Sequence, residues 1–133
     1  ANVDDVDKFT FSNDSRSTLS ALLSQSSRLP AGMANSGTAG YVGGGYTSGS
    51  TSTIDKIAFS NDARTTLSAT LSNGTYSHGA NADTGTAGYF GGGSNQGNRV
   101  DKITFSNDSK SSLATGLSSS RNYLVGFANC GVL

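Results

Sequence analysis

Asp55-Lys56-Ile57-Ala58-Phe59-Ser60-Asn61-Asp62 occurs in three versions along this chain, and this repetition is the main evidence for the type of fold. The first version is Asp7-Lys8-Phe9-Thr10-Phe11-Ser12-Asn13-Asp14, and the third is Asp101-Lys102-Ile103-Thr104-Phe105-Ser106-Asn107-Asp108. The step from position 7 to 55 is 48 residues, and the step from 55 to 101 is 46. A period of this length is typical of repeat proteins, in which one unit cannot bury its apolar face alone. The fold therefore depends on how the repeats stack.

Each version begins as a strand and ends as a turn. In residues 54–59 apolar residues alternate with polar ones, which is the period-two pattern of a half-buried β-strand. The other two versions repeat the pattern, although the alternation slips at the Asp-Lys pair. Ser-Asn-Asp follows each time, and Asn and Asp favour turns because their side chains bond to nearby backbone.

Three further segments complete each unit. One carries two leucines four residues apart, and its Ser and Thr residues favour a strand over a helix. Another is residues 31–34, matched by residues 124–128 in the last unit. The last is residues 38–42, matched by residues 86–90, and three glycines close it each time. The leucine pairs are Leu19 and Leu23, Leu67 and Leu71, and Leu113 and Leu117.

Four short strands in each unit of about 47 residues predict an all-β chain built as a β-propeller, with one four-stranded blade for each repeat. The chain is then a single repeat domain over residues 1–133. Its units cover about residues 1–48, 49–94 and 95–133, and the last unit is incomplete.

These segments resemble the kelch repeat. Gly-Tyr-Val-Gly-Gly-Gly at 40–45 and Gly-Tyr-Phe-Gly-Gly-Gly at 88–93 resemble the kelch strand that ends in a double glycine. Phe-Ser-Asn-Asp stands where the family has an aromatic-Asp turn, and Ser27-Arg28 and Ser120-Arg121 look like its arginine. The chain departs from the family because it has no tryptophan, and three leucines take that place: Leu19, Leu67 and Leu113.

The sequence pattern of these repeats is also similar to that of kelch-like proteins of phages and marine microbes. The resemblance covers nearly the whole chain. It implies a propeller and says almost nothing about activity, because one fold hosts many functions.

In kelch order the chain starts at the third strand of a blade, runs through two whole blades and stops one strand into the next. Propellers typically have 4–8 blades, so three repeats do not close a ring, and open strand edges are normally paired or covered. We expect either that several chains complete the ring or that the chain is part of a longer one. Two copies forming a six-bladed ring with two-fold symmetry are the simplest closed solution.

The composition narrows the classes of partner. Charged residues make up 14% of the chain and the formal net charge is zero, so an electrostatic nucleic-acid binder is not expected. No apolar run is long enough for a membrane helix. The single cysteine, Cys130, excludes an internal disulfide, and either a buried thiol or pairing with another chain is open to it. We expect no cofactor, and a processed chain located outside the cell or on a virion surface.

One strand breaks the repeat and supplies the candidate site. Tyr76, His78, Asn81 and Asp83 lie in the third segment of the second unit, where the first unit has Arg28 to Asn35. The innermost strand of a propeller blade often lines the channel, so these side chains could form a polar ligand site. A blade that has drifted in sequence is the alternative. His78 is the only histidine, which leaves no multi-histidine metal site within one chain.

No catalytic arrangement can be identified, because the sequence spacing of the many Ser and Asp residues does not select a Ser-His-Asp triad around the one histidine. The glycine triplets also lack the Lys-Ser/Thr of a phosphate loop. The sequence therefore favours a non-enzymatic, self-assembling protein with a structural and binding role. Hydroxyls, amides and the five tyrosines suit sugars, so a glycan-binding, lectin-like role is the sharper hypothesis. The rival is a purely structural subunit of a fibre, sheath or virion decoration.

Overall fold

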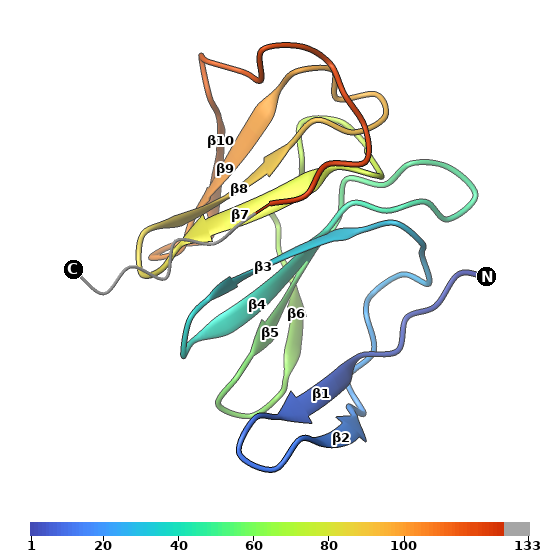
Figure 1. Ribbon diagram of the computed structural model, residues 1–133, viewed down its shortest axis with the longest axis vertical. Coiled ribbons are helices and arrows are strands. Elements are labelled where there is room, and N and C mark those ends of the chain that lie inside the picture. Colours follow the sequence, from blue (N-terminus) through green and yellow to red (C-terminus); the bar gives the residue numbers. More distant parts are fainter. Residues whose placement is uncertain (127–133) are drawn as a thin grey trace.

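The computed structural model describes residues 1–126, and the all-β prediction is confirmed for them (Figure 1). Ten strands form three antiparallel sheets, and no helix occurs within this range. The small sheet pairs β1 (Asp7–Thr10) with β2 (Ser15–Thr18). The second sheet contains β3 (Ala31–Asn35), β4 (Ala39–Gly43), β5 (Ile54–Ala58) and β6 (Arg64–Thr66). The third contains β7 (Gly79–Asp83), β8 (Ala87–Gly91), β9 (Val100–Thr104) and β10 (Ser109–Ser112).

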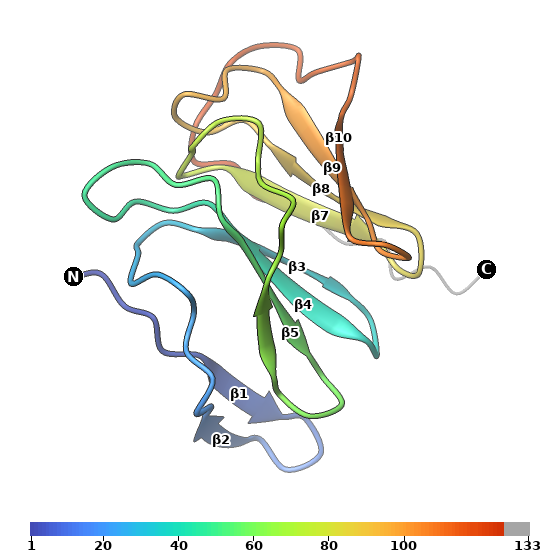
Figure 2. The ribbon, with the colours of Figure 1, turned by 180° about the vertical axis from the view of Figure 1, so that it is seen from behind.

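The two four-stranded sheets are built alike, each from consecutive strands that pair in chain order. Even the register repeats, since Tyr41 stands opposite Lys56 in one sheet and Tyr89 stands opposite Lys102 in the other. The first strands of the two sheets, β3 and β7, lie side by side, while β6 and β10 lie far apart (Figures 1 and 2). The sheets therefore fan out from a shared inner edge.

The repeated Ser-Asn-Asp sequence forms the turn that the sequence predicts. Asn61 Oδ1 accepts a hydrogen bond from the backbone N–H of Ala63 at 3.1 Å, and Asp62 takes a positive φ of 57°. This local bond closes the turn between β5 and β6 and explains why Asn and Asp are needed there. The same bond recurs with the same length in the other two units, between Asn13 and Ser15 and between Asn107 and Ser109.

The leucine segments differ from the prediction that they continue a strand. Strand β6 ends at Thr66, one residue before Leu67. The backbone N–H of Leu67 then donates to the Ile54 carbonyl, and that of Leu71 donates to the Ser52 carbonyl, both at 2.9 Å. The chain leaves the ladder at this point because these bonds fold it back along the start of β5, where Leu71 is buried between the sheets.

The core lies between the two large sheets and not inside either one. Tyr41 and Ile54 from one sheet pack against Phe90, Ile103 and Phe105 from the other, and all five are buried. The rings of Tyr41 and Phe105 are stacked, with 5.1 Å between their centroids. Each of these sheets therefore buries its apolar face against the neighbouring sheet, as stacked repeats do.

The start of the fourth unit is only partly within the described range. Leu124, Val125 and Gly126 belong to the predicted final strand, and they do not form one. The remainder of that predicted strand, residues 127 and 128, and the thiol of Cys130 lie outside the described residues.

Substitution of two equivalent glycines should separate the covered sheet face from the open one. A Cβ atom on Gly43 would lie 2.8 Å from Cζ of Phe90 in the neighbouring sheet, whereas a Cβ on Gly91 would meet nothing closer than Val100 Cγ2 at 3.4 Å. We expect Gly43→Ala to lower the free energy of unfolding by about 1–3 kcal/mol, because overpacking displaces a buried ring. Gly91→Ala should change it by less than about 0.5 kcal/mol. Urea unfolding of both variants measures the difference, and equal losses would mean that the sheets do not pack in this way.

Candidate functional site

The four residues that the sequence singles out lie in three different surroundings. Tyr76 precedes β7 and stands edge-on against Tyr46, with 5.1 Å between ring centroids. His78 also precedes β7, but it is buried. Asn81 and Asp83 are exposed on β7, and of these two only Asn81 lines a cavity on the third sheet. The structure therefore does not bring the four side chains together in one pocket.

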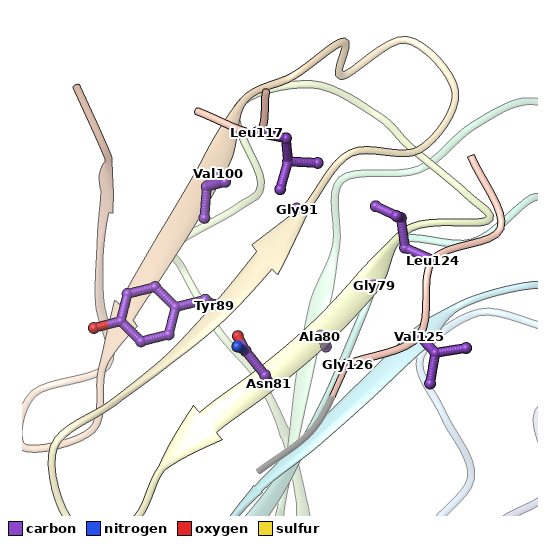
Figure 3. Close-up of a pocket in the computed structure, with 10 residues that line it drawn as sticks. All are labelled: Gly79, Ala80, Asn81, Tyr89, Gly91, Val100, Leu117, Leu124, Val125 and Gly126. Carbon is purple, nitrogen blue, oxygen red and sulfur yellow. The ribbon is translucent and has the colours of Figure 1, made fainter. Parts of the chain in front are cut away.

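The cavity lies on the outer face of the third sheet and has a volume of about 390 Å³ (Figure 3). Asn81 and Tyr89, which are opposite each other in the β7–β8 register, supply its polar side chains. Val100, Leu117 and Leu124 supply much of its apolar lining. Figure 3 shows the Tyr89 ring extending away from Leu117 and Leu124, so the hydroxyl is presented at the rim of the cavity.

His78 is held between the glycine-rich ends of the two sheets. Its ring lies 5.6 Å from the ring of Phe90, and a Cβ on Gly44 would approach His78 Cε1 to 2.6 Å. Gly44 has a φ of +66° as well, so glycine is required there for both space and backbone conformation. Within the described residues, neither imidazole nitrogen makes a hydrogen bond of normal geometry.

The surroundings keep His78 uncharged at neutral pH. Burial lowers the pKa of His78 to about 4, because the charged imidazolium is poorly solvated there, and the backbone of Gly43 offsets this only in part. Among residues 1–126, no serine or carboxylate bonds to this neutral ring, so no side chain is placed to relay a proton to or from it. The side chain thus fills space in the core.

An aromatic cluster at the loop end of the sheets was not predicted as a unit. The guanidinium of Arg28 lies 4.9 Å from the centre of the Tyr46 ring, and Tyr46 also contacts Tyr76. The backbone groups of Arg28 and Tyr46 bond to each other in both directions, which holds this ledge in place. Tyr46 follows a glycine triplet directly, and that position in the sequence was the signal available.

Two buried carboxylates form a second unpredicted feature, which we call the aspartate clamps. Asp101 accepts hydrogen bonds from the backbone N–H and the hydroxyl of Ser72, both at 2.7 Å, although Ser72 belongs to the preceding unit. The Ser112 hydroxyl at 2.7 Å and the Gln96 amide at 3.0 Å complete the set. Asp55 accepts the same pair of bonds from Ser24.

Hydrogen bonds lower the pKa of Asp101 by more than burial raises it. Burial alone would raise the pKa of Asp101, but the donors from Ser72, Ser112 and Gln96 together lower it below its usual value. The carboxylate therefore stays ionised at neutral pH although its side chain is fully buried. The repeated Asp-Lys pair, where the strand alternation slips, was the signal for this site in the sequence.

Within residues 1–126, no group of three or more His, Cys, Asp or Glu side chains is placed to hold a metal ion. In the same range no helix is long and apolar enough to cross a membrane. No protein-family model matches the chain, and no curated protein matches it.

The clamps should contribute to stability according to whether a preceding unit covers them. We expect Asp101→Asn to lower the free energy of unfolding by about 3 kcal/mol, because the amide replaces an acceptor with a donor that faces the Ser72 N–H. Asp7→Asn changes the equivalent residue, which is exposed within a single chain, and should lower the free energy of unfolding of the monomer much less. Chemical denaturation of the two variants compares them, and an effect of equal size would argue against a clamp between units.

Protonation of His78 should make the fold sensitive to mild acid. Its pKa is about 4 in the folded state against 6.5 for the free side chain, so the unfolded state binds more protons between these values. The stability is complete above pH 6.5 and falls as the pH drops toward 4. We expect a loss of about 2 kcal/mol between pH 7.5 and pH 5.0.

Urea titrations at the two pH values measure this loss. The matched control is His78→Phe, which keeps a ring in the same space and should unfold with nearly the same free energy at both pH values. A wild-type protein equally stable at pH 7.5 and pH 5.0 would contradict the burial of an unpaired histidine.

Proposed function

We propose that this protein is a non-enzymatic, self-assembling, kelch-like β-propeller with a structural and binding role. The observation that carries the proposal is a ladder of backbone bonds between successive units. The Ser77 N–H donates to the Leu29 carbonyl at 3.1 Å, and the Tyr123 N–H donates to the Ser77 carbonyl at 2.7 Å. These three residues also share a positive φ of 56–58°.

The ladder supports a propeller because it links the inner ends of the units in a regular series. Leu29 and Ser77 each stand two residues before an innermost strand, β3 or β7, and these two strands lie side by side. Tyr123 holds the equivalent place in the third unit. A series that advances by one unit at each step around an axis is what a propeller requires. Two chains that together supply six units are the simplest ring, and the aspartate clamps supply a regular contact between them.

The aromatic ledge of Arg28, Tyr46 and Tyr76 supports a binding role for this assembly. Sugar rings stack on aromatic faces, and an arginine beside them supplies donors for hydroxyl groups. The ledge contains no acidic side chain, and the chain as a whole is poor in charge, so a neutral glycan is the ligand class that fits it best. The alternative role is a purely structural subunit of a fibre, sheath or virion decoration, in which the ledge binds no small ligand.

The composition supports a location outside the cell or on a virion surface. Serine, threonine, asparagine and glycine dominate the chain, and charged residues make up only 14% of it. A rigid ring with repeated weak sites would bind a glycan-coated surface through avidity.

The native mass of the intact protein tests the assembly. Light scattering should give the mass of two chains, because six units close a ring and three do not. A monomer at all concentrations would overturn the self-assembly proposal. A very large mass would favour the fibre or sheath, and imaging of the particle would then decide between these forms.

The same preparation tests the ledge on an array of neutral glycans followed by calorimetry. Tyr76→Ala should weaken binding about tenfold, because it removes one stacking face. Tyr123→Ala is the matched control, since the Tyr123 side chain is 79% exposed and lies outside the ledge, and the ladder uses only the backbone of this residue. If the assembled protein bound no glycan, the glycan-binding role would be wrong and the purely structural role would remain.

A further inference from the structure

The same three side-chain contacts recur between neighbouring units. One face of the chain carries the donors of these contacts without their acceptors, and another face carries the acceptors without their donors. The donor face is the outer face of the third sheet with the loop after β10, and it carries Tyr89, Lys102 and Ser118. The acceptor face is the β1–β2 hairpin, and it carries Asp7, Phe11 and Asp14. In the interfaces inside the chain, each of these residue types meets its counterpart from the other face.

A lysine–aspartate pair forms the first part of the pattern. Lys8 binds the Asp62 carboxylate of the next unit at 2.8 Å, and Lys56 binds Asp108 of the unit after it at 2.7 Å. Lys102 is the third lysine of this series and Asp14 is the third aspartate. Neither forms an ion pair or a side-chain hydrogen bond among residues 1–126.

An aromatic contact forms the second part. Tyr41 stacks on Phe105, which follows β9 of the next sheet, and donates its hydroxyl to Asp108 at 2.8 Å. The equivalent tyrosine of the donor face is Tyr89, whose hydroxyl stands at the cavity rim (Figure 3). The equivalent phenylalanine of the acceptor face is Phe11, which is 94% exposed, while Phe105 is only 7% exposed.

The aspartate clamp forms the third part. Ser24 donates to Asp55 across one interface, and Ser72 donates to Asp101 across the next. Ser118 continues the series of serines, and the first aspartate of the series is Asp7. Asp7 bonds to Arg16 and Thr18 of its own hairpin, so it lacks the donors from a preceding unit that the other two clamps have.

We infer that the donor face binds the acceptor face of a second copy of this chain, head to tail, through Lys102–Asp14, Tyr89–Phe11 and Ser118–Asp7 contacts. The inference rests on the proposed self-assembly and names the surfaces that carry it. The occupant is a second copy because the donor face needs an aspartate and an aromatic ring at the spacing of the Phe-Ser-Asn-Asp turn, and the acceptor face of this chain presents that turn uncovered. The charges are complementary, and two such contacts close a two-chain ring.

Charge reversal tests this contact in the intact protein. Lys102→Glu and Asp14→Lys should each weaken self-association at least about tenfold, because each places like charges opposite one another. An equal mixture of the two variants should restore the wild-type mass. In the mixed pair, the carboxylate introduced at position 102 of one chain meets the ammonium group introduced at position 14 of the other, and the second contact is native. Analytical ultracentrifugation over a concentration series measures both effects.

One control variant, one further test variant and one check of folding accompany the charge reversals. Arg99→Glu reverses a charge of the same sign on an exposed residue outside the donor face and should leave the mass unchanged. Phe11→Ser removes the aromatic contact without altering any charge and should also weaken association. Thermal unfolding of each variant checks that it folds.

The outcomes separate this inference from the proposed function. A wild-type protein that assembles while Lys102→Glu, Asp14→Lys and Phe11→Ser leave its mass unchanged would overturn only the head-to-tail contact. Single variants that dissociate but are not rescued by mixing would overturn the pairing of Lys102 with Asp14. A monomeric wild-type protein would overturn both the contact and the self-assembly.

Discussion

The hydrogen bonds that Asp55 and Asp101 accept from serines of the preceding unit are the interactions on which this fold depends. A buried carboxylate loses its hydration, and several donors are needed to offset that loss. Asp101 obtains them from both sides of the interface, from Ser72 in one unit and from Ser112 in its own sheet. Because the serine and the carboxylate belong to different units, a sheet satisfies its charge only when its neighbour is in register. The clamp therefore fixes the position of each sheet relative to the next.

The apolar core depends on the same register. Phe90 and Ile103 are fully buried in the cluster that the two large sheets form together, and Gly43 of the neighbouring sheet lies directly against the Phe90 ring. A single four-stranded sheet would leave these side chains in water, so its folding and its stacking are one event. The β1–β2 hairpin illustrates the converse, since all eight of its strand residues are exposed and two strands alone are marginally stable. Stability in this chain is thus a property of interfaces.

Features that depend on residues close together in the sequence could be predicted, and features that depend on residues far apart in the sequence could not. The Asn61 turn rests on a bond over two residues, and the strands rest on a period of two, so both are legible. The point where β6 ends depends on the Ser52 carbonyl that receives Leu71, and the role of Asp101 depends on Ser72, which lies 29 residues away. The candidate site shows the same limit, because His78 is buried by glycine turns at positions 44 and 93 while Asn81, three residues later, faces a cavity.

The phenylalanine that precedes each Ser-Asn-Asp turn shows that the preceding unit determines how exposed a side chain is. Phe105, Phe59 and Phe11 occupy the same place in the three repeats, and their exposures are 7%, 44% and 94%. Phe105 is preceded by a complete four-stranded sheet, Phe59 by the two-stranded hairpin, and Phe11 by no strand of the described chain. The residue, the turn and the local backbone are the same in each case, so exposure follows from how much of the preceding unit is present. Every repeat therefore carries the residues for the same contact. Where the chain supplies no neighbour for them, these residues stay exposed and can bind another molecule.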